Sequence, residues 1–97
     1  MPTQAFTKLF GRYPDVIDAM PQIFDSHQFI LELARRYQGP YTEALSGYSR
    51  KPAPFQIVHG ILAGHLNACT ELVQRVGNVI SADIFGNQNQ CAQWRKL

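Results

Sequence analysis

The sequence is short of cysteine and has no long apolar run. Its 97 residues include two cysteines, Cys69 and Cys91, which are too few for a disulfide scaffold. Unbroken apolar runs reach three residues at most, so we expect neither a signal peptide nor a transmembrane helix. These features favour a cytoplasmic protein with free thiols and no membrane partner.

Charge of either sign is also scarce. Nine Lys and Arg oppose seven Asp and Glu, which gives a net charge of +2, and charged residues make up 16% of the chain. Nucleic-acid-binding domains usually carry a denser basic patch, so the total charge neither supports nor excludes such a partner. The length and the 45% of hydrophobic residues predict a single domain, residues 1–97, with its own core.

The motifs of the common catalytic and metal sites are missing as well. The sequence has no C-x-x-C pair and no glycine-rich phosphate loop. The candidate zinc ligands are His65 and Cys69, together with Cys91 and either His59 or His27. His59 and His65 fall on opposite sides of the predicted helix, however. We therefore predict no metal site, no cofactor and no enzymatic activity.

The apolar residues recur at helical spacing over most of the first 67 positions. The predicted helices span residues 3–13, 14–20, 26–37, 40–48 and 55–67. Asp25 or Ser26 can cap the third of them, and Asp25 and Gln28 have the spacing of a capping box. Gly39 stands where a glycine ends a helix in the left-handed conformation, so we expect a break there.

The pattern changes to β-branched residues after position 71. Two such segments, 72–76 and 79–85, flank Gly77 and Asn78, a pair typical of a two-residue hairpin turn. A polar loop at 86–90 then leads into a tail, in which Cys91 and Trp94 are expected to pack onto the body. The chain is therefore predicted to be an α+β domain, mostly helical, with a C-terminal β-hairpin.

This order of elements resembles that of the winged-helix superfamily. Residues 54–62 are similar to the start of its third helix, which begins with a proline. The resemblance covers residues 26–85. It divides the chain into a helical extension at 1–24, a winged-helix-like core at 25–85 and a tail at 86–97. It implies that the third helix of the core enters the major groove of DNA and that the hairpin contacts the backbone.

That resemblance implies a nucleic-acid partner and assigns roles to specific residues. The glutamine and asparagine side chains would face the bases, since both can pair with adenine, and the basic residues would meet phosphates. The candidate nucleic-acid-binding residues are Arg50, Lys51, Gln56, His59, Asn67 and Arg75. The helix face itself has no Lys or Arg, which limits its capacity to neutralise phosphates.

The same helix supports a second hypothesis. Gly60, Ala63 and Gly64 follow a spacing that places small residues on one face, where another helix can approach closely. The chain would then be a non-catalytic protein-interaction module, or a homodimer, that uses this face. For His65 and Trp94 we prefer structural roles: a core histidine bonded to a backbone carbonyl, and a core plug that anchors the tail.

Overall fold

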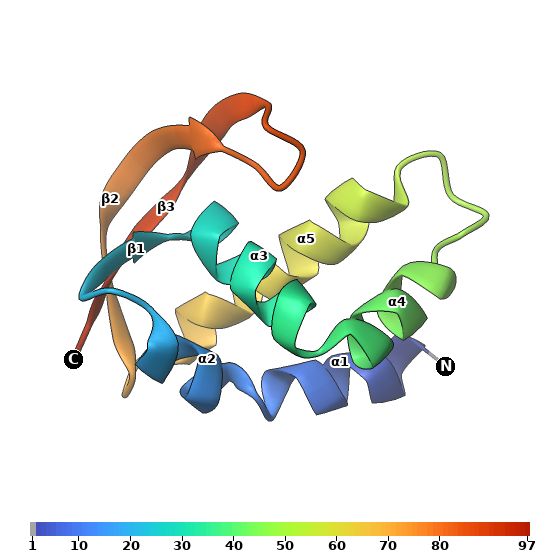
Figure 1. Cartoon of the computed structure of the whole chain (residues 1–97), viewed down its shortest axis with the longest axis horizontal. Coiled ribbons are helices and arrows are strands. Elements are labelled where there is room, and N and C mark those ends of the chain that lie inside the picture. Colours follow the sequence, from blue (N-terminus) through green and yellow to red (C-terminus); the bar gives the residue numbers. More distant parts are fainter. Residues whose placement is uncertain (1) are drawn as a thin grey trace.

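This computed structural model describes residues 2–97, with side chains from Gln4 onward. These residues form five α-helices and a three-stranded antiparallel sheet (Figure 1). The helices are α1 (Pro2–Phe10), α2 (Tyr13–Ala19), α3 (Ser26–Arg36), α4 (Gln38–Ser46) and α5 (Pro54–His65), and a 3-10 turn, η1 (Leu66–Ala68), follows α5. The strands are β1 (Ile23–Asp25), β2 (Val73–Ala82) and β3 (Gln88–Lys96). The predicted α+β class with a C-terminal hairpin is confirmed.

The start of α3 follows the predicted capping box. The Asp25 carboxylate accepts a hydrogen bond from the backbone N–H of Gln28 at 2.9 Å, and the Gln28 side-chain oxygen accepts one from the Asp25 N–H at 2.8 Å. Two backbone donors that the helix leaves unpaired are thereby satisfied. The apolar stripe of α3 is buried through Phe29, Ile30 and Leu33.

The break that we expected at Gly39 falls earlier in the chain. Helix α3 ends at Arg36, Tyr37 joins it to α4, and Gly39 already lies in the first turn of α4. Pro40 follows it there, because the first turn of a helix does not need the N–H that proline lacks. Among the described residues the glycines with positive φ are Gly77 and Gly86.

The core lies between the helices and the sheet. Its largest buried side chains include Tyr13, Phe24, Phe29 and Leu62. The Tyr13 hydroxyl donates to the backbone carbonyl of Leu62 and so ties α2 to α5. His65, which we expected within the core, is half-buried at its edge, with its ring stacked on Phe10 at 3.7 Å.

The hairpin turn lies later in the chain than predicted. Gly77 and Asn78 do not turn the chain: β2 continues through them, and the turn falls at residues 83–87. Gly77 instead forms a β-bulge, with φ of 148° and a register shift between Arg75 and Gly77. Glycine relieves backbone strain both at a β-bulge and in a hairpin turn. The glycine at position 77 therefore could not show which of these two structures the chain forms there.

The predicted tail is the central strand of the sheet. Strand β3 pairs with both neighbours, in the order β1-β3-β2, and the pair Asp25 and Gln93 fixes its position against β1. Trp94 is the buried plug that we expected: it is 2% exposed, and its indole N–H donates to Ser26 Oγ at 3.0 Å. Both cysteines are free thiols. None of the described helices is long and apolar enough to span a bilayer.

Candidate functional site

A groove separates α5 from the β2–β3 hairpin. It consists of two hollows of about 220 and 320 Å³, which share His27, Ile30 and His59. Helix α5 and η1 form one wall, residues 83–94 of the hairpin form the other, and the first turns of α3 lie between them (Figure 1). We call this feature the α5–hairpin groove.

The α5 wall of the groove is formed by small and polar residues. Gln56, Gly60, Gly64 and Asn67 are exposed there, and Ala63 is half-buried. Beyond its chain neighbours and the backbone of its own helix, a Cβ atom built on Gly60 or Gly64 would meet no described atom within 4 Å. The two glycines therefore do not serve a close contact within this chain, and they leave space along the helix.

His59 lies where the two hollows meet. Its Nε2 atom is 2.6 Å from the hydroxyl of Tyr41, and the rings of Phe55 and Phe85 flank it at 5.8 and 6.4 Å. Burial lowers the pKa of His59; the charge of nearby Asp83 opposes this shift, whereas His27 adds to it. His59 is thus a neutral group at pH 7, which can accept or donate a hydrogen bond but offers no charge to a ligand.

The hairpin wall contributes aromatic and amide side chains. Phe85 is 55% exposed and packs edge-to-face on Phe55, which is 38% exposed, at 4.7 Å. Asn87, Asn89 and Gln90 add amide groups. The end of the groove at the hairpin turn is therefore an exposed aromatic pair beside hydrogen-bonding side chains.

Asp83 organises the hairpin turn beside that aromatic pair. Its carboxylate accepts hydrogen bonds from the backbone N–H groups of Phe85 and Asn87 and from the Asn89 side chain. Desolvation raises the pKa of Asp83, but these hydrogen bonds and the nearby His27 outweigh it, and the pKa lies below the ordinary value. Among the described residues that line the groove, Asp83 is the only Asp, Glu, Lys or Arg.

The structure divides the predicted nucleic-acid-binding residues into two groups. Gln56, His59 and Asn67 all line the groove. Arg50 and Lys51 are exposed in the segment between α4 and α5, at one end of the long axis of the molecule, whereas the strand that carries Arg75 lies at the other end (Figure 1). Arg75 also donates to Asn78. The basic residues therefore do not form a band along the groove.

The residues of the alternative hypothesis line the same groove. Gly60, Ala63 and Gly64 belong to its α5 wall, facing Cys91 and Ala92 of β3. Both hypotheses for α5 thus refer to one surface.

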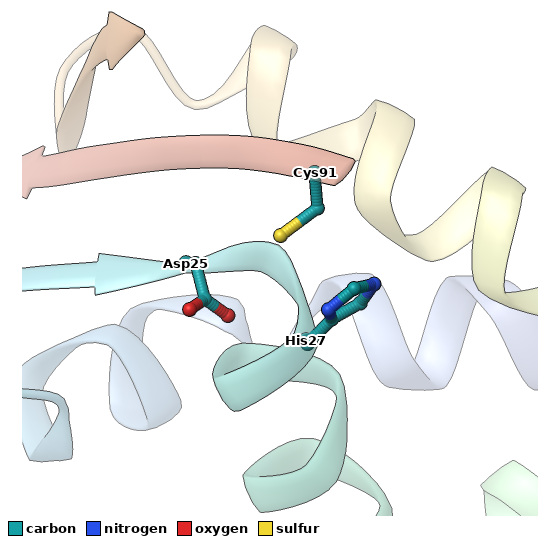
Figure 2. Close-up of side chains that lie close together, drawn as sticks. All are labelled: Asp25, His27 and Cys91. Carbon is teal, nitrogen blue, oxygen red and sulfur yellow. The ribbon is translucent and has the colours of Figure 1, made fainter. Parts of the chain in front are cut away.

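Other segments bring further residues to this surface, and no sequence pattern indicated that they belong to it. Asp83 had a local signal, since Asp at the first position of a β-turn and Gly at the fourth, here Gly86, are typical of such a turn. His27 and Cys91 were named only as additions to a zinc set around His65 and Cys69. No local signal links them to each other or to Asp25, because the pairing of distant strands brings them together. These two side chains lie beside Asp25, and donor atoms of all three are within 4.8 Å of one another (Figure 2). Among the described residues this trio, and not the set around His65 and Cys69, could hold a metal ion.

Comparisons with known proteins assign no family to this geometry. No protein-family model matches the chain, and neither a curated protein nor a solved structure matches it significantly. Its function therefore has to be argued from its own residues.

Proposed function

We propose that this chain is a non-catalytic protein-interaction module, which binds an extended peptide segment of a partner protein in the α5–hairpin groove. The observation that carries this proposal is the composition of the groove: it is lined mainly by amide, apolar and histidine side chains, and Asp83 is its one Asp, Glu, Lys or Arg among the described residues. Most of the affinity of nucleic-acid complexes comes from neutralised phosphates, and this surface has no group to do so.

The chemistry of the two walls suits a peptide backbone. An amide side chain offers both donors and an acceptor, and so can satisfy the N–H and C=O groups of an extended chain. Gln56 and Asn67 supply such groups on one wall and Asn89 supplies one on the other. Ile84 and the exposed ring of Phe85 add apolar surface for the side chains of the peptide. The space beside Gly60 and Gly64 leaves room for it along α5.

Substitution of a groove glycine tests this proposal. Gly64→Leu directs an apolar side chain into the groove, where a Cβ meets nothing within 4 Å, so the core is not disturbed. Gly39→Leu is the matched control, because Gly39 is an exposed helical glycine with equally open space, in α4 and outside the groove. Peptides are selected from a random phage-displayed library on the wild-type chain, and their binding is measured by fluorescence anisotropy.

We expect the selected peptides to bind at least tenfold more weakly to Gly64→Leu, about 1.4 kcal/mol, and equally well to Gly39→Leu. Circular dichroism checks that both variants are folded. Peptides that bind Gly64→Leu as tightly as the wild type, or a library without enriched peptides, would contradict the proposal.

A second candidate function, single-stranded nucleic-acid binding, is favoured by one specific observation. The exposed rings of Phe55 and Phe85 lie close to the start of α5, and Arg50 and Lys51 are exposed in the segment that precedes it. Aromatic faces on which bases stack, next to basic residues, are the usual components of such sites. This candidate retains two of the basic residues expected from the sequence and needs no charge on α5.

The test of this candidate is a titration with a fluorescein-labelled 20-nucleotide single strand at low salt. Arg50→Glu with Lys51→Glu is expected to abolish binding, and Phe85→Ala to weaken it. Arg35→Glu with Arg36→Glu, an equally exposed pair on α3, is the control for net charge. If the wild-type chain does not bind the strand, or if both pairs of substitutions reduce binding equally, this candidate is wrong.

A further inference from the structure

The sheet register and the start of α3 bring three metal-ligand side chains together. Asp25 is the last residue of β1 and caps α3, and His27 lies in the first turn of that helix. Asp25 pairs with Gln93 of β3, and Cys91 lies two residues before Gln93, on the same face of the strand. Figure 2 shows the Cys91 sulfur pointing from β3 toward the start of α3, where Asp25 and His27 lie.

The separations are close to those of a metal site. One donor atom each from Asp25, His27 and Cys91 lies within 4.8 Å of the other two. Tetrahedral coordination with ordinary zinc bond lengths needs ligand atoms about 3.3–3.8 Å apart. His27 and Cys91 are half-buried, so small side-chain rotations can supply the contraction without moving the backbone.

The hydrogen bonds that these side chains already make are compatible with metal binding. The Asp25 carboxylate uses one oxygen, Oδ1, to cap α3, and an ionised carboxylate can accept several bonds. The His27 Nδ1 atom contacts Ser81 Oγ at 2.8 Å, and that hydroxyl also lies 3.6 Å from the Cys91 sulfur. A metal bound at His27 Nδ1 would replace the contact with Ser81. The Ser81 hydroxyl would then be free to donate to a thiolate at Cys91, the kind of outer hydrogen bond that orients metal ligands.

We propose that Asp25, His27 and Cys91 bind a single transition-metal ion of the zinc type. A carboxylate, an imidazole and a thiolate form a ligand set that suits Zn²⁺ and Co²⁺, whereas Mg²⁺ and Ca²⁺ take oxygen ligands. On binding, the Cys91 thiol releases its proton to solvent and its sulfur bonds to the metal. His27 and Cys91 line the α5–hairpin groove, so the fourth coordination position is open to water or to a ligand in the groove.

Such an ion would also act on the fold. It would connect the end of β1, the start of α3 and the middle of β3, three segments that the sheet and the helix cap bring together. Because an unfolded chain does not hold these ligands together, the binding free energy adds to the stability of the folded state. The thermal midpoint should rise by roughly 10 °C or more at about one hundred times Kd.

The test is a cobalt titration of the full, untagged chain, with a non-thiol reductant and no peptide present. We expect a thiolate-to-cobalt charge-transfer band that saturates at one equivalent and disappears when Zn²⁺ is added. Cys91→Ser should abolish the band, and Cys69→Ser, which removes the other half-buried thiol, should preserve it.

The other two ligands have matched variants. Asp25→Asn retains a good helix cap and removes the charge, so it should weaken cobalt binding at least tenfold in a folded protein. His27→Gln should do the same, and His65→Gln should not. A missing band, a band that survives in Cys91→Ser, or equal losses in Cys69→Ser and Cys91→Ser would each overturn the proposal. The titration needs no peptide, so its outcome is independent of the proposed function.

Discussion

The hydroxyl of Tyr41 in α4 lies 2.6 Å from Nε2 of His59 in α5. Tyr41 is buried and His59 is half-buried, and burial raises the pKa of Tyr41 and lowers that of His59. The pair is therefore held in its neutral form. Protonation of His59 would place a positive charge at a half-buried position beside the Tyr41 hydroxyl, at a side-chain contact that joins α4 to α5.

This pair makes stability depend on pH in a defined direction. The pKa of His59 is lower in the folded state, so between the folded value and the ordinary value of about 6.5 the unfolded chain binds more protons. We expect the free energy of unfolding to be greatest above about pH 6.5 and to fall at lower pH. The loss should be below about 1.4 kcal/mol per pH unit, since His59 is only half-buried.

Urea denaturation at a series of pH values measures this effect. His65, whose pKa is also lowered by burial, contributes in the same direction. His59→Gln keeps a hydrogen-bonding group beside Tyr41 and removes the titration, so its dependence on pH should be weaker than that of the wild type. Equal slopes for the two proteins would show that His59 does not carry the effect.

The contact between Trp94 and Ser26 should contribute to stability through a buried hydrogen bond, and Ser26 Oγ also donates a longer one to the Ala92 carbonyl at 3.5 Å. The Trp94 indole N–H donates to Ser26 Oγ at 3.0 Å, and both residues are buried. Ser26→Ala leaves that donor unpaired, which should cost about 1–3 kcal/mol of unfolding free energy. Ser46→Ala, at an exposed position in α4, should change it by less than about 0.5 kcal/mol. Equal urea midpoints for the two variants would contradict this account.

The helix cap at Asp25 should respond to the chemistry of the substituent. Asp25→Ala removes the acceptor of the Gln28 N–H and should lower the unfolding free energy by about 1 kcal/mol. Asp25→Asn keeps an acceptor and should stay close to the wild type in metal-free buffer. Chemical denaturation in the presence of a chelator separates this local effect from any metal. If Asn were as costly as Ala, the carboxylate charge would matter to the fold by itself.

The helices could be predicted because their signals are local. The spacing of Phe29, Ile30 and Leu33 and the capping box of Asp25 and Gln28 are visible within a few positions of sequence, and the structure confirms both. The sheet depends on pairings between distant segments. Strand β3 begins with Gln88, Asn89 and Gln90, which are exposed and poor in strand propensity, so no local pattern marked it as the central strand.

In the candidate site, too, the part formed by one helix could be predicted from the sequence, and the part formed by strand pairing could not. Gln56, Gly60 and Asn67 share a helix face, so their common surface followed from helical periodicity alone. The opposite wall did not, because Cys91 reaches His27 only through the register of β3 against β1. The separation of Arg50 from Arg75 could not be predicted either, since it depends on where β2 lies relative to α5.

Gly77 lies at the β-bulge although its sequence context predicted a hairpin turn. Substitution of Gly77 should show how much the fold depends on its backbone conformation. A Cβ at Gly77 would meet no described atom within 4 Å, but φ is 148°, a conformation that other residues rarely adopt. Gly77→Ala should therefore lower the unfolding free energy by about 1–3 kcal/mol. Differential scanning calorimetry and urea denaturation both measure this loss.

Gly64 provides the opposite case with the same empty surroundings. It lies in α5, its φ is not positive, and a Cβ there also meets no described atom within 4 Å. Gly64→Ala should raise the unfolding free energy by about 0.5–1 kcal/mol, because alanine loses less backbone entropy in a helix. The two substitutions add the same methyl group to open space, so opposite signs can come only from the backbone conformation. A loss at Gly64 as large as that at Gly77 would show that the groove is narrower than the structure has it.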